Sequence, residues 1–214
     1  MIVSPLANYT ILSPNHGSRP ASQKIDVVTI HCLVAQWRAK QIGDYFSQES
    51  VAASPNYGIG KDGSVVCCVP EESRSWCSSN RDNDGRAITI EVASDTFSPY
   101  AVTSEAYAKL IDLLVDICKR NGIAELKWLA DPAYIGQPDK QNMTVHRWFA
   151  NKSCPGEWLY SRYSEIAEKV NERLKTDNVW YRVQVGAFRK KENAKAYVKK
   201  LKEIGIDAFI VEGK

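Results

Sequence analysis

Short runs of β-branched residues alternate along this chain with segments of helical periodicity, and that alternation limits the folds it can adopt. The runs IDVVTIHCLV and AITIEV, at residues 25–34 and 87–92, are typical of buried strands. Between them and beyond them lie helical patterns. Residues 104–120 carry apolar side chains every three to four positions, with Ser104 as the expected N-cap and a stop at Asn121–Gly122. This interleaving predicts one α/β domain over residues 1–174.

The same region contains signals for a hairpin and two loops. SPNYGIGKDGSVVCCVP predicts two short strands, at 56–60 and 64–69, joined by a turn at Asp62–Gly63. The polar run ESRSWCSSNRDNDGR predicts a loop, and a second loop, from Trp128 to Asn142, is long enough to wall a cleft. Two further helices are expected, at residues 37–46 and 159–174.

A second pattern begins after a short polar linker at residues 175–178. VWYRVQVG alternates apolar and polar residues, residues 193–204 have a helical apolar stripe, and DAFIV is strand-like. Residues 179–214 are therefore predicted to form a small βαβ unit. A unit of this size has too small a core to be stable alone.

Composition restricts the class of protein. With 44% apolar and 25% charged residues, the chain has the composition of a soluble globular protein. A net charge of +3 is too small to indicate nucleic acid, but it suits an anionic surface such as a Gram-positive cell wall. The sequence contains no run of 18 apolar residues, so no membrane span is expected. The N-terminus has no secretory pattern, which predicts synthesis in the cytoplasm.

The six cysteines are expected to be reduced, because no secretory signal is present. Cys32 and Cys118 lie in apolar patterns and are predicted to pack in the core. Cys67 and Cys68 are adjacent on a predicted strand, so their side chains point to opposite faces and cannot readily share one ion. We expect these two and Cys77 to be structural.

Two histidines and a cysteine form the strongest candidate for a reactive site. His146 and Cys154 are eight residues apart in TVHRWFANKSCPGEW, with a Pro-Gly turn after the cysteine, and His31 lies near the end of the first apolar run. Two imidazoles and one thiolate are a donor set for catalytic zinc, which keeps its fourth position open for water. The remaining histidine, His16, lies in a loop rich in Pro, Asn and Gly and is expected at the surface.

These motifs also carry a resemblance to a known family. TIHCLV, SPNYGIGKDGSV, AITIEV and TVHRWFANKSCPGEW, in that order, resemble the type 2 N-acetylmuramoyl-L-alanine amidases, a superfamily that includes phage amidases and peptidoglycan-recognition proteins. The resemblance covers about residues 20–174. It implies a central mixed β-sheet flanked by helices, with zinc at the floor of a groove on His31, His146 and Cys154. The implied reaction is hydrolysis of the amide between N-acetylmuramic acid and L-alanine.

The resemblance implies roles for further residues. Glu91 matches the family's catalytic glutamate, and Lys152 matches its lysine beside the last ligand, where an ammonium would stabilise an oxyanion. The chain departs from the family at Asn56 and Cys77, where many members have histidine. It also has Pro55 where some phage members use a catalytic tyrosine. This departure favours Glu91 over a tyrosine as the catalytic residue. The candidate substrate contacts are Tyr57, Trp76, Asn80, Arg147 and Trp148.

The segment VWYRVQVGAFRKKENAKAYVKKLKEIGIDAFIV resembles the first half of a SPOR domain, a family whose whole domains have two such halves and bind peptidoglycan glycan strands. A single half implies a truncated remnant, docking on the amidase domain, or pairing in a homodimer. Exposed strand edges favour the homodimer.

The resemblances together suggest a phage endolysin that lyses cell walls after release from the cytoplasm, an antimicrobial activity. The alternatives are a bacterial autolysin or sporulation hydrolase, a non-catalytic peptidoglycan-binding protein, and a structural zinc protein with Cys77 or Cys32 as a fourth ligand. Both histidines and the cysteine ligand are present together, which favours a zinc hydrolase.

Overall fold

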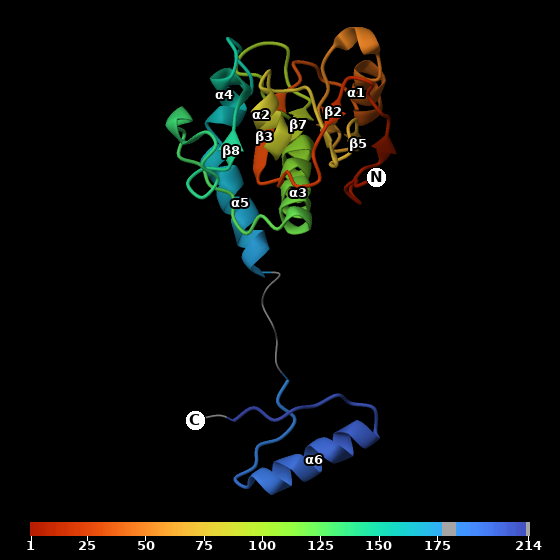
Figure 1. The fold of residues 1–214 in the computed structure, drawn as a ribbon, viewed down its shortest axis with the longest axis vertical. Helices are drawn as coiled ribbons and strands as arrows, with labels where there is room; N and C mark the ends of the chain where they lie inside the picture. The colour runs from red at the N-terminus through yellow and green to blue at the C-terminus, as the bar shows by residue number, and fades with distance from the viewer. Residues whose placement is uncertain (177–182, 213–214) are drawn as a thin grey trace. The chain divides into compact units, whose positions relative to one another are not determined.

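The computed structural model describes residues 1–176 and 183–212, and the chain divides into two compact units, Met1–Asn178 and Val179–Lys214. The first unit contains a six-stranded sheet in the order β1-β5-β4-β7-β3-β8 (Figure 1). Neighbouring strands are parallel except for β4 and β5, which form the predicted antiparallel hairpin. The sheet is therefore mixed, as predicted. Its strands are β1 (Tyr9–Thr10), β3 (Val27–Cys32), β4 (Tyr57–Ile59), β5 (Val65–Cys67), β7 (Ala87–Val92) and β8 (Met143–Thr144).

Helices cover both faces of this sheet. On one face α3 (Ser104–Asn121) and α5 (Tyr163–Thr176) pack against each other and over β3 and β7, and on the other α1 (Ala39–Phe46) packs on β4 and β5. The remaining helical segments of the unit are η1 (Glu49–Val51), α2 (Arg81–Arg86), η2 (Pro132–Tyr134), η3 (His146–Trp148) and α4 (Gly156–Tyr160).

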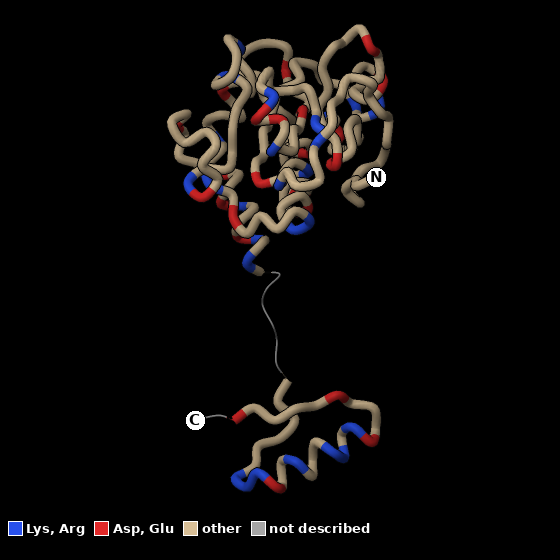
Figure 2. The backbone as a smooth tube through the Cα atoms, in the orientation of Figure 1, with Lys and Arg blue, Asp and Glu red and all other residues tan. Residues whose placement is uncertain are grey.

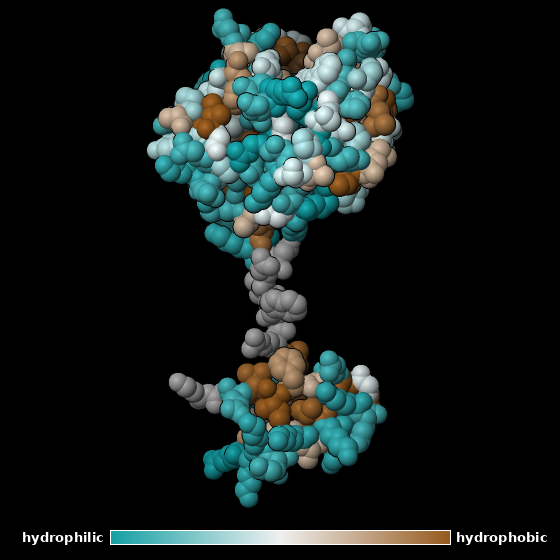
Figure 3. Space-filling model, viewed as in Figure 1, coloured by the Kyte–Doolittle hydropathy of each residue, from teal (hydrophilic) through white to brown (hydrophobic). Residues whose placement is uncertain are grey.

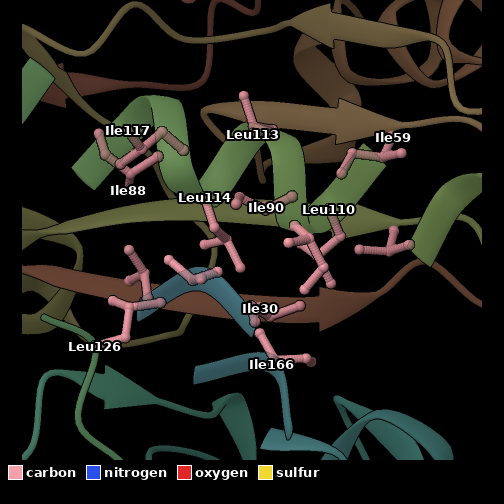
Figure 4. Packing of buried hydrophobic residues seen from close by; sticks show 14 of the residues in the cluster. Ile30, Ile59, Ile88, Ile90, Leu110, Leu113, Leu114, Ile117, Leu126 and Ile166 are labelled. Atoms are coloured by element: carbon pink, nitrogen blue, oxygen red, sulfur yellow. The ribbon is translucent and has the colours of Figure 1, made fainter. Parts of the chain in front are cut away.

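The two central strands carry different chemistry on their two faces. Successive strand residues point to opposite sides of a sheet. Ile30 and Ile90 join the fully buried core under α3, where Leu110 and Leu114 pack between them (Figure 4). The residues that alternate with these isoleucines toward the end of each strand, Thr29 and His31 on β3 and Thr89 and Glu91 on β7, are polar and lie on the opposite face. Because one face is apolar and the other polar, the register of β3 on β7 is strongly specified. Cys32 and Cys118 lie in the apolar core, as predicted.

Several element boundaries differ from the sequence prediction. Thr103, not Ser104, caps α3, because its hydroxyl accepts a hydrogen bond from the Ala106 N–H at 3.2 Å. The stop at Gly122 is as predicted, with φ 67°. The predicted loop at 72–86 contains β6 (Ser73–Arg74), which pairs with β2 (Gly17–Ser18), and the capped helix α2. The predicted helix at 159–174 is two helices, α4 and α5, separated by a turn.

The second unit contains one helix, α6 (Lys191–Glu203), where a helix was predicted. The two flanking strands of the predicted βαβ unit are not formed: the structure assigns no strand in 183–190 or 204–212. Strand propensity needs a paired ladder, and no partner ladder exists within the described part of this unit. The start of the first predicted strand, at 179–182, and the end of the predicted linker, at 177–178, lie outside the described residues.

Apolar side chains of the second unit remain largely open to solvent. Leu201 is buried, whereas Val183, Phe209 and Ile204 are 86%, 80% and 71% exposed. Figure 3 shows apolar residues, in brown, gathered on the visible face of this unit. Within residues 1–176 and 183–212, none of the helices combines the length and hydrophobicity needed to cross a bilayer.

Candidate active site

The candidate metal ligands stand where the parallel strands end. His31 on β3 lies opposite Glu91 on β7. β8 pairs with β3 so that Thr144 is in register with Thr29, and His146 and His31 each follow two residues later. The two imidazole rings therefore meet, with centroids 5.1 Å apart. In α/β sheets this carboxyl edge is the usual place for a ligand site.

Cys154 approaches the histidines from the turn before α4. The Arg147 N–H donates to the Cys154 carbonyl at 3.1 Å, which holds the turn against η3. Gly156 has φ 78°, and a Cβ there would lie 2.8 Å from the Cβ of Tyr100. The turn therefore requires glycine, which explains the Pro-Gly pair after the cysteine. In this position the Cys154 sulfur lies 3.3 Å from Nδ1 of His31.

The trio fits a zinc ion. The donor atoms of His31, His146 and Cys154 all lie within 4.8 Å of one another. A tetrahedral zinc with Zn–S about 2.3 Å and Zn–N about 2.1 Å holds a sulfur and a nitrogen ligand about 3.6 Å apart. The observed 3.3 Å between Cys154 Sγ and His31 Nδ1 is close to that value. His31 is buried while the other two are partly exposed, so the open side of the trio faces solvent.

A second group, His31, Cys77 and Glu91, shares His31 with the trio. Among the described residues, no four such side chains place their donor atoms within 4.8 Å of one another. A closed four-ligand site, as structural zinc prefers, is therefore not formed here. This arrangement favours an open, catalytic site over the structural alternative with Cys77 or Cys32.

The Glu91 side chain lies beside the trio and is 14% exposed, with its Oε2 atom buried. Its Oε1 lies 4.0 Å from Nδ1 of His31 and accepts a hydrogen bond from the Cys77 thiol at 3.8 Å. Its Oε2 has no hydrogen-bond partner among the described residues. Burial raises the pKa of Glu91 from 4.5 to about 7, and the Cys77 hydrogen bond opposes that rise. A carboxyl group with a near-neutral pKa suits proton transfer at physiological pH.

The ligands themselves are held in the states that a metal requires. Burial lowers the pKa of His31 to about 3, and the His146 charge adds to this effect. Burial also lowers the pKa of His146, helped by the Lys152 ammonium. Both imidazoles are therefore neutral near pH 7. A hydrogen bond with Cys32, followed by burial, raises the pKa of the Cys154 thiol well above its usual value, so metal binding there would release a proton.

The loop that carries Cys77 is anchored by a residue that sequence analysis did not single out. Asp84 on α2 accepts hydrogen bonds from the backbone N–H groups of Cys77 and Ser78, at 3.0 and 3.2 Å, and from the Ser78 hydroxyl at 2.6 Å. The next residue, Ser79, places its hydroxyl 3.0 Å from Nε2 of His146. The loop thus contacts both the candidate base and a candidate ligand.

A buried polar floor lies beneath the site and was also missed. The Thr29 and Thr144 hydroxyls are 2.7 Å apart, and the Asn83 side chain donates to Thr29 at 3.0 Å and accepts from Thr144 at 2.9 Å. The sequence contained a signal for it. TIH and TVH place a threonine two residues before His31 and His146, and such residues share one face of a strand.

Tyr57 does not contact solvent and is removed from the predicted substrate contacts. Its side chain is fully buried, and its hydroxyl donates to Glu71 at 2.6 Å. Glu71 in turn pairs with Arg120 at 2.6 Å. The hairpin tyrosine points into the core because β4 is a central strand with both faces covered.

The other predicted contacts lie in structural roles near the site or at its rim. Asn80 caps α2 by accepting from the Asn83 N–H at 2.9 Å. Arg147 lies over the Tyr160 ring at 4.5 Å, and Trp148 stacks on Trp128 at 5.1 Å. Trp76 is 39% exposed and remains the most accessible of the five. Lys152 is exposed, and its charge acts on His146.

Comparison with known proteins gives matches along most of the chain. A model of the N-acetylmuramoyl-L-alanine amidase family (Amidase_2) matches residues 21–157, and a SPOR-domain model matches residues 158–212. Both resemblances predicted from the motifs are thereby confirmed. No curated protein sequence gives a significant match.

Solved structures share the fold at low sequence identity. AmpD is 20% identical, with a TM-score of 0.55 over 78% of this chain and 99% of that one. A mutant endolysin from Bacillus subtilis is 16% identical (TM-score 0.55; 77% and 99% covered). The amidase LysC from Clostridium intestinale is 18% identical (TM-score 0.52; 76% and 97% covered).

The SPOR match begins inside the first unit. It includes α5, whose Ile166 and Val170 are fully buried in the core that also contains α3 residues. Packing therefore assigns α5 to the first unit, and the division between units falls at Asn178 and Val179.

Proposed function

Because the chain belongs to the N-acetylmuramoyl-L-alanine amidase family, we propose that it is a zinc-dependent peptidoglycan hydrolase that cleaves the amide between N-acetylmuramic acid and L-alanine. The observation that carries this proposal is the convergence of His31, His146 and Cys154 within 4.8 Å, beside the buried carboxylate of Glu91. A non-catalytic wall-binding protein would have no need for a base with a near-neutral pKa next to an open donor trio.

The metal ligands and Glu91 have separate roles in the proposed reaction. When bound, zinc supplies Lewis acidity, which polarises a carbonyl and makes water a stronger nucleophile near neutral pH. His31, His146 and Cys154 would hold the ion. Glu91 removes the proton from the attacking water and returns it to the leaving amine of L-alanine. Its raised pKa suits both transfers, because the group must be ionised first and protonated afterwards.

Two further groups support this reaction. The Cys77 thiol donates to Oε1 of Glu91, so Oε2 is the carboxylate atom without a hydrogen-bond partner among the described residues. Lys152, exposed beside His146, supplies a positive charge for the oxyanion that forms as the amide carbon becomes tetrahedral.

Metal analysis of variants tests the ligand assignment. Wild-type protein, loaded with zinc and desalted, should retain one equivalent, and His31→Ala, His146→Ala and Cys154→Ala should each retain far less. The third histidine provides a matched control, because His16 is exposed and lies outside the trio. If His16→Ala lost zinc and the trio variants kept it, the ligand assignment would be wrong.

We also propose that the protein acts as a phage endolysin, made in the cytoplasm and reaching the wall after release. The fold is shared with proteins named as endolysins, among them one from Bacillus subtilis. Cytoplasmic expression in a Gram-positive host should lyse cells only after the membrane is permeabilised. Lysis of intact cells without permeabilisation would favour a bacterial autolysin or sporulation hydrolase.

A further inference from the structure

The charges of this chain are segregated between its two units. Of 28 lysines and arginines and 25 acidic residues, nine basic and four acidic residues lie in 179–214. The second unit therefore has a net charge of +5, and residues 1–178, with 19 basic and 21 acidic residues, have −2. The formal charge of +3 for the whole chain is therefore the sum of a basic segment, residues 179–214, and a weakly acidic one, residues 1–178.

Most of the basic residues lie on or next to α6. Lys191, Lys195, Lys199 and Lys202 follow one another at intervals of three or four residues, which places them on one face of the helix. Figure 2 shows Lys and Arg, in blue, recurring along α6. All four are exposed, and at 1.5 Å per residue they extend over about 16 Å. The buried Leu201 lies on the other side of the helix. The basic face is thus held outward by the packing of the apolar one.

Part of this charge is not neutralised within the unit. Lys191 pairs with Glu212 at 2.5 Å, and Lys202 lies 3.9 Å from Asp207. Lys195, Lys199 and the adjacent exposed Lys200 have no ion-pair partner in the part of the chain that the structure describes. Lys195 and Lys199 share the face described above, and Lys200 lies about 100° further round the helix. These three are called the unpaired lysines of α6 below. Like charges kept close together without partners cost stability, so an anionic partner would relieve them.

We propose that the unpaired lysines of α6 bind a phosphodiester-linked anionic polymer of the bacterial cell wall. The choice of a wall polymer among polyanions rests on the proposed function, because the attached catalytic unit acts on the wall. Binding would raise the local concentration of the enzyme on its insoluble substrate, since tethering makes the second encounter intramolecular.

Two other polyanions fit the helix less well. Binding to single-stranded nucleic acid needs aromatic side chains interleaved with the basic ones, and the one aromatic residue of α6, Tyr197, packs against Phe188 at 5.4 Å. Binding to a lipid surface needs a free apolar helix face beside the basic one. On α6 that face carries Leu201, which is buried within the unit, and the most exposed apolar residues, Val183 and Phe209, lie outside the helix.

The test uses the full chain and purified Gram-positive walls, before and after hydrofluoric acid removes the phosphodiester polymer. The variant is Lys195→Gln/Lys199→Gln/Lys200→Gln. One lysine near an anionic surface raises affinity about fivefold. Replacing three lysines should therefore weaken binding, measured by co-sedimentation, about 100-fold at low salt. Binding of wild type should weaken as salt rises, and stripping the walls should abolish the difference between the proteins.

A matched control removes the same charge from the first unit, at the exposed Lys24, Lys61 and Lys175. It should bind native walls like wild type. The proposal is overturned if the α6 variant binds like this control, or if stripping leaves wild-type affinity unchanged. Tighter binding to duplex DNA or to anionic lipid vesicles than to walls at equal salt would also overturn it. All three proteins should hydrolyse a soluble muramoyl peptide at equal rates. If none of them hydrolysed it, the proposed amidase activity would be wrong, and the binding result would still stand by itself.

Discussion

Replacement of Glu91 by glutamine should inactivate the enzyme and, at the same time, stabilise its metal-free form at high pH. The carboxyl group is buried at the floor of the site, with only a thiol as its hydrogen-bond donor among the described residues. Its ionised form is therefore poorly solvated in the folded state. Glutamine has nearly the same shape but carries no charge, so it avoids that cost at every pH.

The magnitude follows from the pKa of Glu91, which burial raises from 4.5 to about 7. Between these two values the folded state binds more protons than the unfolded state, so wild-type stability falls as pH rises. One pH unit corresponds to about 1.36 kcal/mol, which gives a loss of about 3 kcal/mol by pH 8. The loss is absent below about pH 4.5. For a domain of this size, about 3 kcal/mol corresponds to roughly 6–12 °C in Tm.

The assay is thermal unfolding of chelator-treated full-length protein at pH 5 and pH 8. Glu91→Gln should exceed wild type in Tm by roughly 6–12 °C at pH 8 and by much less at pH 5. Glu172→Gln, at an exposed site on α5, is the control and should match wild type at both pH values. Equal Tm values for wild type and Glu91→Gln at pH 8 would refute the claim that Glu91 is buried with an elevated pKa.

Three further predictions concern stability and positioning. Leu114→Ala should cost about 2–5 kcal/mol in urea unfolding, because this leucine is fully buried between α3 and the sheet; a cost under 1 kcal/mol would contradict the packing. Arg120→Ala should cost about 3–5 kcal/mol by leaving the buried Glu71 carboxylate without its ion pair, and an unchanged denaturation midpoint would argue against the pair. Asp84→Ala should lower kcat while leaving zinc content intact, because it releases the loop that contacts Glu91; full turnover would remove that role.

Sequence periodicity predicted the framework because the central elements carry strong local signals. The runs around His31 and Glu91 are β-branched, and the helix ending at Gly122 has both a clear apolar period and a stop. The grouping of His31, His146 and Cys154 was predictable from chemistry, because the chain has only three histidines and one of them lies eight residues before a cysteine. Cys77 was placed among structural cysteines, yet the structure brings it to Glu91.

The remaining features depend on contacts between distant segments. Ser79 reaches His146 only because Asp84 anchors the intervening loop from α2, and short elements such as α2 and β8 form because tertiary partners complete them. Tyr57 was predicted to pack or to line the groove, and it packs in the core because the sheet order places β4 between β5 and β7. The two strands predicted in the second unit are not formed, because the described part of that unit offers no strand for them to pair with.

Product analysis tests the proposed activity most directly. Purified peptidoglycan should be digested with zinc-loaded protein, with chelated protein and with Glu91→Gln, and the new termini identified by mass spectrometry. Zinc-loaded wild type should release stem peptides with a free L-alanine amine and leave intact glycan strands, while the other two samples release almost none. New reducing sugar ends, cleavage within the stem peptide, or equal release by the chelated protein would contradict a zinc amidase built on His31, His146 and Cys154.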